Sequence, residues 1–157
     1  MKQDRFLTGI LIGIAVLVVA AVAVFFIRRD TQSYISEETP EGVVHNYVLA
    51  VLNGDYQKAY DYLADLENKP TYEEFRDAFI KGMVNPNNSA VDVGQSEVNN
   101  DTASVEVAML YNSSDPFSTG YRDTQRAILV KQDGAWKISS MPGYYYWEYN
   151  WYQEKVK

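Results

Sequence analysis

The sequence predicts a membrane-anchored α+β protein: an N-terminal transmembrane helix, then about three helices packed on a four-stranded or larger antiparallel sheet. Three observations lead to this prediction. Residues 6–27 are uniformly apolar, residues 40–80 repeat apolar side chains with the period of a helix, and residues 90–140 alternate apolar and polar side chains as strands do. Helices followed by antiparallel strands are typical of the α+β class.

The apolar run is long enough to cross a membrane. It covers 22 residues, Phe6 to Ile27, without a charge. A helix of that length rises about 33 Å, whereas the hydrocarbon core of a bilayer is about 30 Å thick. A cleaved signal peptide has a shorter apolar segment, so we expect residues 6–27 to remain in the lipid bilayer as a single-pass anchor after a short tail, residues 1–5. Gly9 and Gly13 have the GxxxG spacing of a helix–helix contact in membranes, although glycine is common in any membrane helix.

Charge bears on location and partners. Basic residues flank both ends of the apolar run, so the positive-inside rule is tied, and the free amino terminus only weakly favours a domain outside the cell membrane. From Asp30 onward the chain has 10 basic and 20 acidic residues. Such a domain repels phosphate backbones, so we expect no nucleic-acid partner. The chain has no cysteine, which excludes disulfides and thiolate chemistry.

After a polar linker, residues 28–38, two helices are predicted. Thr39 can cap the first, and Pro40 suits its first turn. One apolar stripe follows at helical spacing: Val44, Tyr47, Val48, Val51 and Leu52. The pair Asn53-Gly54 ends this helix, and Asp55 caps a second one that continues to about Leu66.

A third helix and four strands complete the domain. Thr71 and Glu74 form a capping box, and Gly82 ends the helix that they open. The clearest strand runs from Ala103 to Tyr111, preceded by a strand from Val91 in which Gly94 marks a bulge. Two further strands are expected at residues 124–131 and 136–140, with turns at residues 99–101 and 132–134.

Several of these segments resemble nuclear-transport-factor-two-like (NTF2-like) domains, a superfamily that includes ketosteroid isomerase. The likeness lies in residues 40–56 with their Gly54-Asp55 turn, in the Ala59-Tyr60 pair, and in the closing residues 133–138. It covers residues 39 to 141. The resemblance implies a strongly curved sheet wrapped round helices into a cone with a cavity, here residues 39–143. Members include isomerases, dehydratases, polyketide cyclases and domains without catalysis.

Tyr47 is the candidate catalytic residue. By resemblance it occupies the position of the tyrosine that donates a hydrogen bond to an enolate in ketosteroid isomerase. That chemistry also needs a carboxylate base, and the acidic stretch 65–70 leads into another helix without placing one. Tyr47 also lies on the apolar stripe of its helix, which favours a core tyrosine. The single histidine, His45, and the absence of cysteine predict no metal site, and we expect no cofactor.

The C-terminal tail, residues 144–157, is dense in aromatic side chains: seven of the nine residues from Tyr144 to Tyr152 are Tyr or Trp. Three interpretations compete, in this order: packing onto the domain, a partner or ligand surface, and contact with the bilayer. We expect residues 144–147 to pack on the domain. The candidate contacts with a partner or ligand are Trp147, Tyr149, Trp151 and Tyr152.

The sequence therefore predicts a non-catalytic binding or accessory domain at the outer face of a bacterial membrane, with a protein or a small ligand as partner. The alternative is an isomerase or cyclase that uses the cone cavity, with Tyr47 as hydrogen-bond donor.

Overall fold

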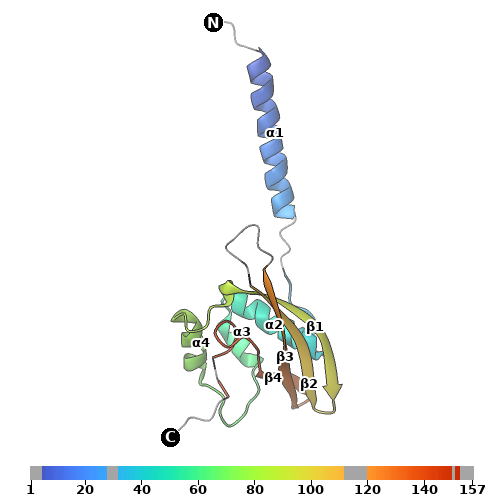
Figure 1. The fold of residues 1–157 in the computed structure, drawn as a ribbon, viewed down its shortest axis with the longest axis vertical. Coiled ribbons are helices and arrows are strands. Elements are labelled where there is room, and N and C mark those ends of the chain that lie inside the picture. The colour runs from blue at the N-terminus through green and yellow to red at the C-terminus, as the bar shows by residue number, and fades with distance from the viewer. Residues whose placement is uncertain (1–4, 28–31, 112–119, 150, 153–157) are drawn as a thin grey trace. The chain divides into compact units, whose positions relative to one another are not determined.

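The structure, a computed structural model, describes residues 5–27, 32–111, 120–149 and 151–152, with side chains of the first helix described for residues 8–24 (Figure 1). The chain separates into two units, Met1–Ser33 and Tyr34–Lys157. The first unit contains helix α1, Arg5–Ile27, whose side chains are exposed at the described positions 8–24. Within the part of the chain that the structure describes, no helix is long and apolar enough to cross a membrane. The single-pass anchor at residues 6–27 stays a prediction.

The helices of the second unit begin where the capping residues predict. Thr39 caps α2 (Pro40–Leu52) by accepting a hydrogen bond from the Gly42 amide, and Asp55 caps α3 (Tyr56–Asp61). The capping box of Thr71 and Glu74 opens α4 (Tyr72–Ile80), as predicted. A short 3-10 helix, η1 (Pro86–Asn88), leads into the sheet.

The sheet is an antiparallel meander in the order β1-β2-β3-β4. Its strands are β1 (Ala90–Asn99), β2 (Thr102–Tyr111), β3 (Tyr121–Gln132) and β4 (Ala135–Ser140). The predicted bulge at Gly94 is confirmed, because the β1–β2 register shifts between Val93 and Ser96. The predicted turns are also confirmed by the positive φ angles of Asn100, Asp133 and Gly134.

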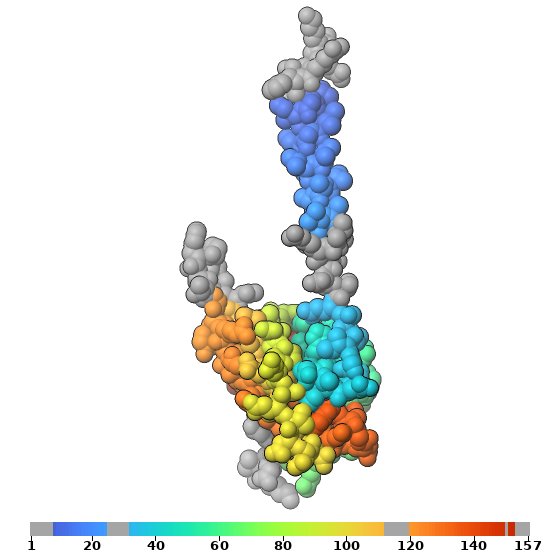
Figure 2. Space-filling view, turned by 90° about the vertical axis from the view of Figure 1, so that its right-hand side faces the viewer, coloured from blue at the N-terminus to red at the C-terminus, as the bar shows by residue number. Residues whose placement is uncertain are grey.

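One hydrophobic core holds this unit together. Figure 1 shows the helices on one face of the sheet, and α2 contacts β1, β2 and β4. In the space-filling view, α2 and strands β1 and β2 form adjoining surfaces on one side of the molecule (Figure 2). The largest fully buried side chains include Trp147, Tyr47, Phe75, Leu63, Met109, Leu129 and Ile138. The α+β prediction, helices on a four-stranded antiparallel sheet, is confirmed.

The second half of the predicted linker is docked on the domain. We call residues 34–38 the strap. The buried Asn46 side chain binds both polar groups of one strap residue: Oδ1 accepts from the Ile35 amide at 2.9 Å, and Nδ2 donates to the Ile35 carbonyl at 2.8 Å. A Cβ at Gly42 would lie 2.0 Å from the Ser36 carbonyl oxygen, so only glycine permits this approach.

The C-terminal segment packs into the same unit. Trp147 is fully buried, and Trp151 is 7% exposed against the rings of Phe75 and Phe79 on α4. The expectation of packing is right for Trp147 and wrong for Tyr144 and Tyr145, which are exposed. The backbone turns at Gly143, after which Tyr144 and Tyr145 face solvent and Trp147 faces the core.

Candidate functional site

The candidate catalytic residue is enclosed by the tail. Tyr47 lies on α2 with no exposed surface, and its hydroxyl donates a hydrogen bond to the Trp147 carbonyl at 2.9 Å. Burial, with a smaller contribution from the negative charge of Glu148, holds the pKa of this hydroxyl well above its ordinary value. The Tyr47 hydroxyl therefore already has its acceptor inside the core. The Trp147 carbonyl of the tail occupies the position where a substrate oxygen would have to accept this hydrogen bond.

A tight turn places Trp147 there. Gly143 has a φ of +89°, and its carbonyl accepts hydrogen bonds from the Tyr146 and Trp147 amides, both at 2.7 Å. A Cβ at Gly143 would lie 2.5 Å from the Met109 sulfur, so this position requires glycine for conformation and for space. The Trp147 indole nitrogen donates to Ser89 Oγ at 2.9 Å, and both groups are buried. Every polar contact of Trp147 is thus made inside the protein.

The tail also carries a carboxyl group with an unusual proton affinity. Burial raises the pKa of Glu148 from 4.5 to about 7, against a smaller opposite effect of a hydrogen bond from the Met141 backbone. Glu148 lines a cleft of about 540 Å³ between β3 and the tail, together with Arg126 and Ser140. Tyr47 does not line this cleft. The tyrosine and the carboxylate therefore do not face one shared cavity, as proton transfer on a substrate would require.

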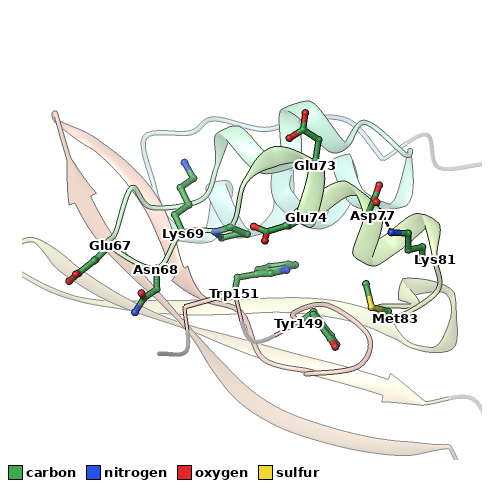
Figure 3. A pocket seen from close by; sticks show the side chains of 11 residues that line it. Glu67, Asn68, Lys69, Glu73, Glu74, Asp77, Lys81, Met83, Tyr149 and Trp151 are labelled. Atoms are coloured by element: carbon green, nitrogen blue, oxygen red, sulfur yellow. Dashed lines mark ion pairs between the residues drawn. The ribbon is translucent and has the colours of Figure 1, made fainter. Parts of the chain in front are cut away.

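A second opening, which we call the acidic groove, lies between α4, the loop before it and the tail (Figure 3). Its volume is about 540 Å³. Four carboxylates line it: Glu67, Glu73, Glu74 and Asp77. Two lysines, two aromatic side chains and Met83 complete most of the wall, so the fixed charge of the groove is negative. A pocket of this size suits a small molecule or a short peptide segment.

The groove lysines are engaged with the protein. Lys81 Nζ lies 2.8 Å from Asp77, and this hydrogen bond is the main cause of the lowered pKa of Asp77. Lys69 Nζ lies 4.6 Å from the centre of the Tyr60 ring. Glu74 is bound into the capping box of α4. Glu67 and Glu73 are exposed and form no ion pair within the described part of the chain.

Trp151 forms the centre of the groove. Figure 3 shows its indole between Glu74 on one side and Tyr149 on the other. Its ring centre lies 4.8 Å from that of Phe75, which joins the groove to the core. The indole nitrogen is buried and has no hydrogen-bond partner among the described residues. An unsatisfied buried donor costs about 1–3 kcal/mol, so this nitrogen gains from an acceptor that a ligand supplies.

The four predicted contact residues of the tail differ in how far they are exposed to solvent. Tyr149 is 38% exposed and lines the groove, so its surface is open to a partner. Trp147 is closed off in the core. Trp151 is buried against α4, and Tyr152 is half buried with its hydroxyl donating to the Ala64 carbonyl at 2.7 Å. Of these rings, that of Trp151 covers Phe75 and Phe79 of α4.

The remaining predicted contact lies in the first unit. Gly9 and Gly13 are on α1, and a Cβ at either would meet nothing within 4 Å in the described structure. Their role in a helix–helix contact stays a prediction. Within the described part of the chain, no group of three or more His, Cys, Asp or Glu residues could hold a metal ion.

Glu73 and Glu148 were not singled out by the sequence. The position of Glu73 beside the tail depends on how a loop far along the chain folds back, which no local pattern reveals. For Glu148 a signal existed: a single carboxylate inside an aromatic run has few polar neighbours and is a candidate for burial.

No protein-family model matches this chain. No curated protein matches it either. Among solved structures, it is similar to a SEC-C motif-containing protein from Rhodopseudomonas palustris, at 18% identity and a TM-score of 0.46 over 68% of this chain and 79% of the other. It is also similar to a candidate NTF2-like transpeptidase from Campylobacter jejuni. The identity is 18% and the TM-score 0.43, over 66% of this chain and 99% of the other. A third similar structure is that of a protein of unknown function from Mycobacterium tuberculosis. The identity is 17% and the TM-score 0.43, over 63% of this chain and 64% of the other. None of the three bears on activity or partner at these TM-scores.

Proposed function

We propose that this chain is a membrane-anchored, non-catalytic binding module, an accessory or assembly domain that holds its partner in the acidic groove at the outer face of a bacterial membrane. The observation that carries the non-catalytic part is the hydrogen bond from the buried Tyr47 hydroxyl to the Trp147 carbonyl. The group that an isomerase or cyclase would present to its substrate is used to fix the tail.

The acidic groove supports the binding part of the proposal. It combines an exposed aromatic ring, Tyr149, with exposed carboxylates and a buried donor that lacks an acceptor. Tyr and Trp side chains are enriched in binding hot spots, and a buried donor gains from an acceptor that a partner supplies.

The apolar run of residues 6–27 supports the anchor. In α1, Leu17 is 71% exposed and Val19 is 68% exposed. Exposed apolar surface of this extent is unfavourable in water by about 25 cal/mol for each Å². A bilayer that takes up residues 6–27 removes that cost.

Membrane insertion is tested with Val16→Arg and Val19→Arg together. Each arginine near a helix centre costs about 2.5–3.5 kcal/mol on insertion scales, so the variant should be extracted by carbonate while the unchanged chain is retained. Protease added to intact cells should remove the domain if it lies outside. Retention of the arginine variant contradicts the anchor, and protection from protease contradicts the orientation.

Binding is tested by site-specific photo-crosslinking of the full chain in its native membrane. A photoreactive amino acid at Tyr149 should give a cross-linked product of discrete size. The same amino acid at Glu106, an exposed position on β2 outside the groove, is the matched control and should not give that product. Identical products from both positions, or none from Tyr149, contradict a partner in the groove.

A further inference from the structure

We infer that the acidic groove binds a basic segment of a protein partner, taking a Lys or Arg side chain between its carboxylates and aromatic rings and a backbone carbonyl at the Trp151 indole N–H. This inference rests on the proposed function, since it names the chemistry of the partner that the binding module holds.

The charge of the groove selects a cation. Glu67 and Glu73 are exposed and have no ion-pair partner among the described residues, whereas Lys81 is 2.8 Å from Asp77. Lys69 lies over the ring of Tyr60. Neither lysine is therefore directed at Glu67 or Glu73. Glu67 and Glu73, which lie apart along the groove in Figure 3, are each available to pair with a basic side chain, and an anion is repelled.

The aromatic rings of the groove favour an organic cation over a metal ion. Tyr149 and Trp151 lie on the same wall of the groove, below the carboxylates of α4 in Figure 3. Ammonium and guanidinium groups are attracted to the faces of such rings, and guanidinium also pairs with carboxylates through two hydrogen bonds. A strongly hydrated metal ion gains nothing from the rings.

The Trp151 indole nitrogen, which has no acceptor among the described residues, favours a peptide ligand over a simple amine. Trp151 is 7% exposed, and its indole N–H has no acceptor within the described chain. An anionic acceptor is disfavoured beside four carboxylates, so a neutral carbonyl is the matching group. A peptide carries such a carbonyl next to each basic side chain. Met83, a flexible side chain that lines the same groove and is 38% exposed, can move to admit the carbonyl to this nitrogen.

The test uses the full chain in neutral detergent, with ¹⁵N-labelled tryptophan. The probe is the peptide acetyl-Gly-Lys-Ala-Lys-Gly-amide, compared with the same peptide carrying Glu for Lys and with n-butylammonium. Binding is measured by titration. The Trp151 indole resonance is assigned with Trp151→Phe or, if that variant does not fold, by elimination with Trp136→Phe and Trp147→Phe, the other two tryptophans of the chain. The basic peptide should bind and shift the Trp151 indole resonance. Butylammonium should bind more weakly without that shift, and the acidic peptide should not bind.

Replacing Glu67 and Glu73 together with Gln should lower the affinity for the basic peptide by about 3- to 10-fold, because two exposed ion pairs with the peptide are lost. The control Glu106→Gln, which removes one exposed carboxylate outside the groove, should leave the affinity unchanged. Equal binding of the acidic peptide, an unchanged affinity in the double variant, or an unmoved Trp151 resonance overturns the inference. If the cross-linking at Tyr149 still succeeds, the binding module stands and only its partner chemistry is wrong.

The chain itself contains one competing cation source, because Lys155 and Lys157 follow Trp151 closely in the sequence. Replacing both with Gln should leave the affinity for the basic peptide within about 2-fold. A rise of 10-fold or more would identify the chain's own end as the occupant of the groove and overturn the inference.

Discussion

The raised pKa of Glu148 predicts that this side chain destabilises the domain at neutral and alkaline pH. In the unfolded chain the carboxyl group has a pKa of 4.5, and burial raises this to about 7 in the fold. The folded state therefore holds the proton more tightly. Below pH 4.5 the group is neutral in both states and costs nothing. As the pH rises from 4.5 towards 7, the carboxyl group ionises in the unfolded chain while the buried group keeps its proton, so stability falls.

The size of the effect follows from the shift. A difference of about 2.5 pKa units corresponds to about 3 kcal/mol, fully expressed above pH 7. The isostere Glu148→Gln keeps the shape and the acceptor for the Met141 backbone but removes the charge. The variant should be more stable than the unchanged chain by about 2–3 kcal/mol at pH 8, and by less than about 1 kcal/mol at pH 5.

The assay is urea unfolding of the full chain in neutral detergent, followed by tryptophan fluorescence at several pH values between 5 and 8. Taking the difference between variant and unchanged chain cancels the titration of all other groups. Glu106→Gln, at an exposed position, is the control and should give the same small difference at every pH. A destabilised Glu148→Gln at pH 8, or a difference that does not change with pH, would refute the reasoning.

Two further substitutions test the packing around α2. Gly42→Ala should release the strap, because its Cβ would lie 2.0 Å from the Ser36 carbonyl; we expect a loss of about 1–3 kcal/mol and faster hydrogen exchange at the Ile35 amide, although alanine usually stabilises helices. An Ile35 amide that remains protected would contradict this. Tyr47→Phe leaves the Trp147 carbonyl without its donor and should cost about 1–2 kcal/mol in urea unfolding at an unchanged slope. An unchanged midpoint would mean that this hydrogen bond contributes nothing.

Local patterns predicted the elements of the fold well. Thr39 and the pair Thr71 and Glu74 mark helix starts because their side chains satisfy amides that any helix leaves open. The bulge at Gly94 follows from one residue that breaks a strict alternation. These signals depend on neighbours within a few positions, so they are visible in one sequence.

The candidate site was harder to predict because it depends on contacts far apart in the chain. The strap looked like a linker, and only the fold reveals that Asn46 binds Ile35 and that Gly42 makes room for the strap. In the tail, the density of aromatic residues correctly indicated packing, but not which side chains face inward. Trp147 and Trp151 are buried while Tyr145 between the strand and Trp147 is exposed, because the turn at Gly143 sets the direction of each.

The most direct test of this account is the stability of a chain that ends at Gly143, because its central claim is that the aromatic tail completes the core and forms a wall of the acidic groove. Removing Trp147 and Trp151, at about 3–5 kcal/mol for each, would consume most of a typical stability of about 5–15 kcal/mol. In urea unfolding, the truncated chain should lose its cooperative transition, whereas Tyr145→Ala, at an exposed position in the same tail, should keep it. A truncated chain that unfolds cooperatively at an unchanged midpoint would contradict the account.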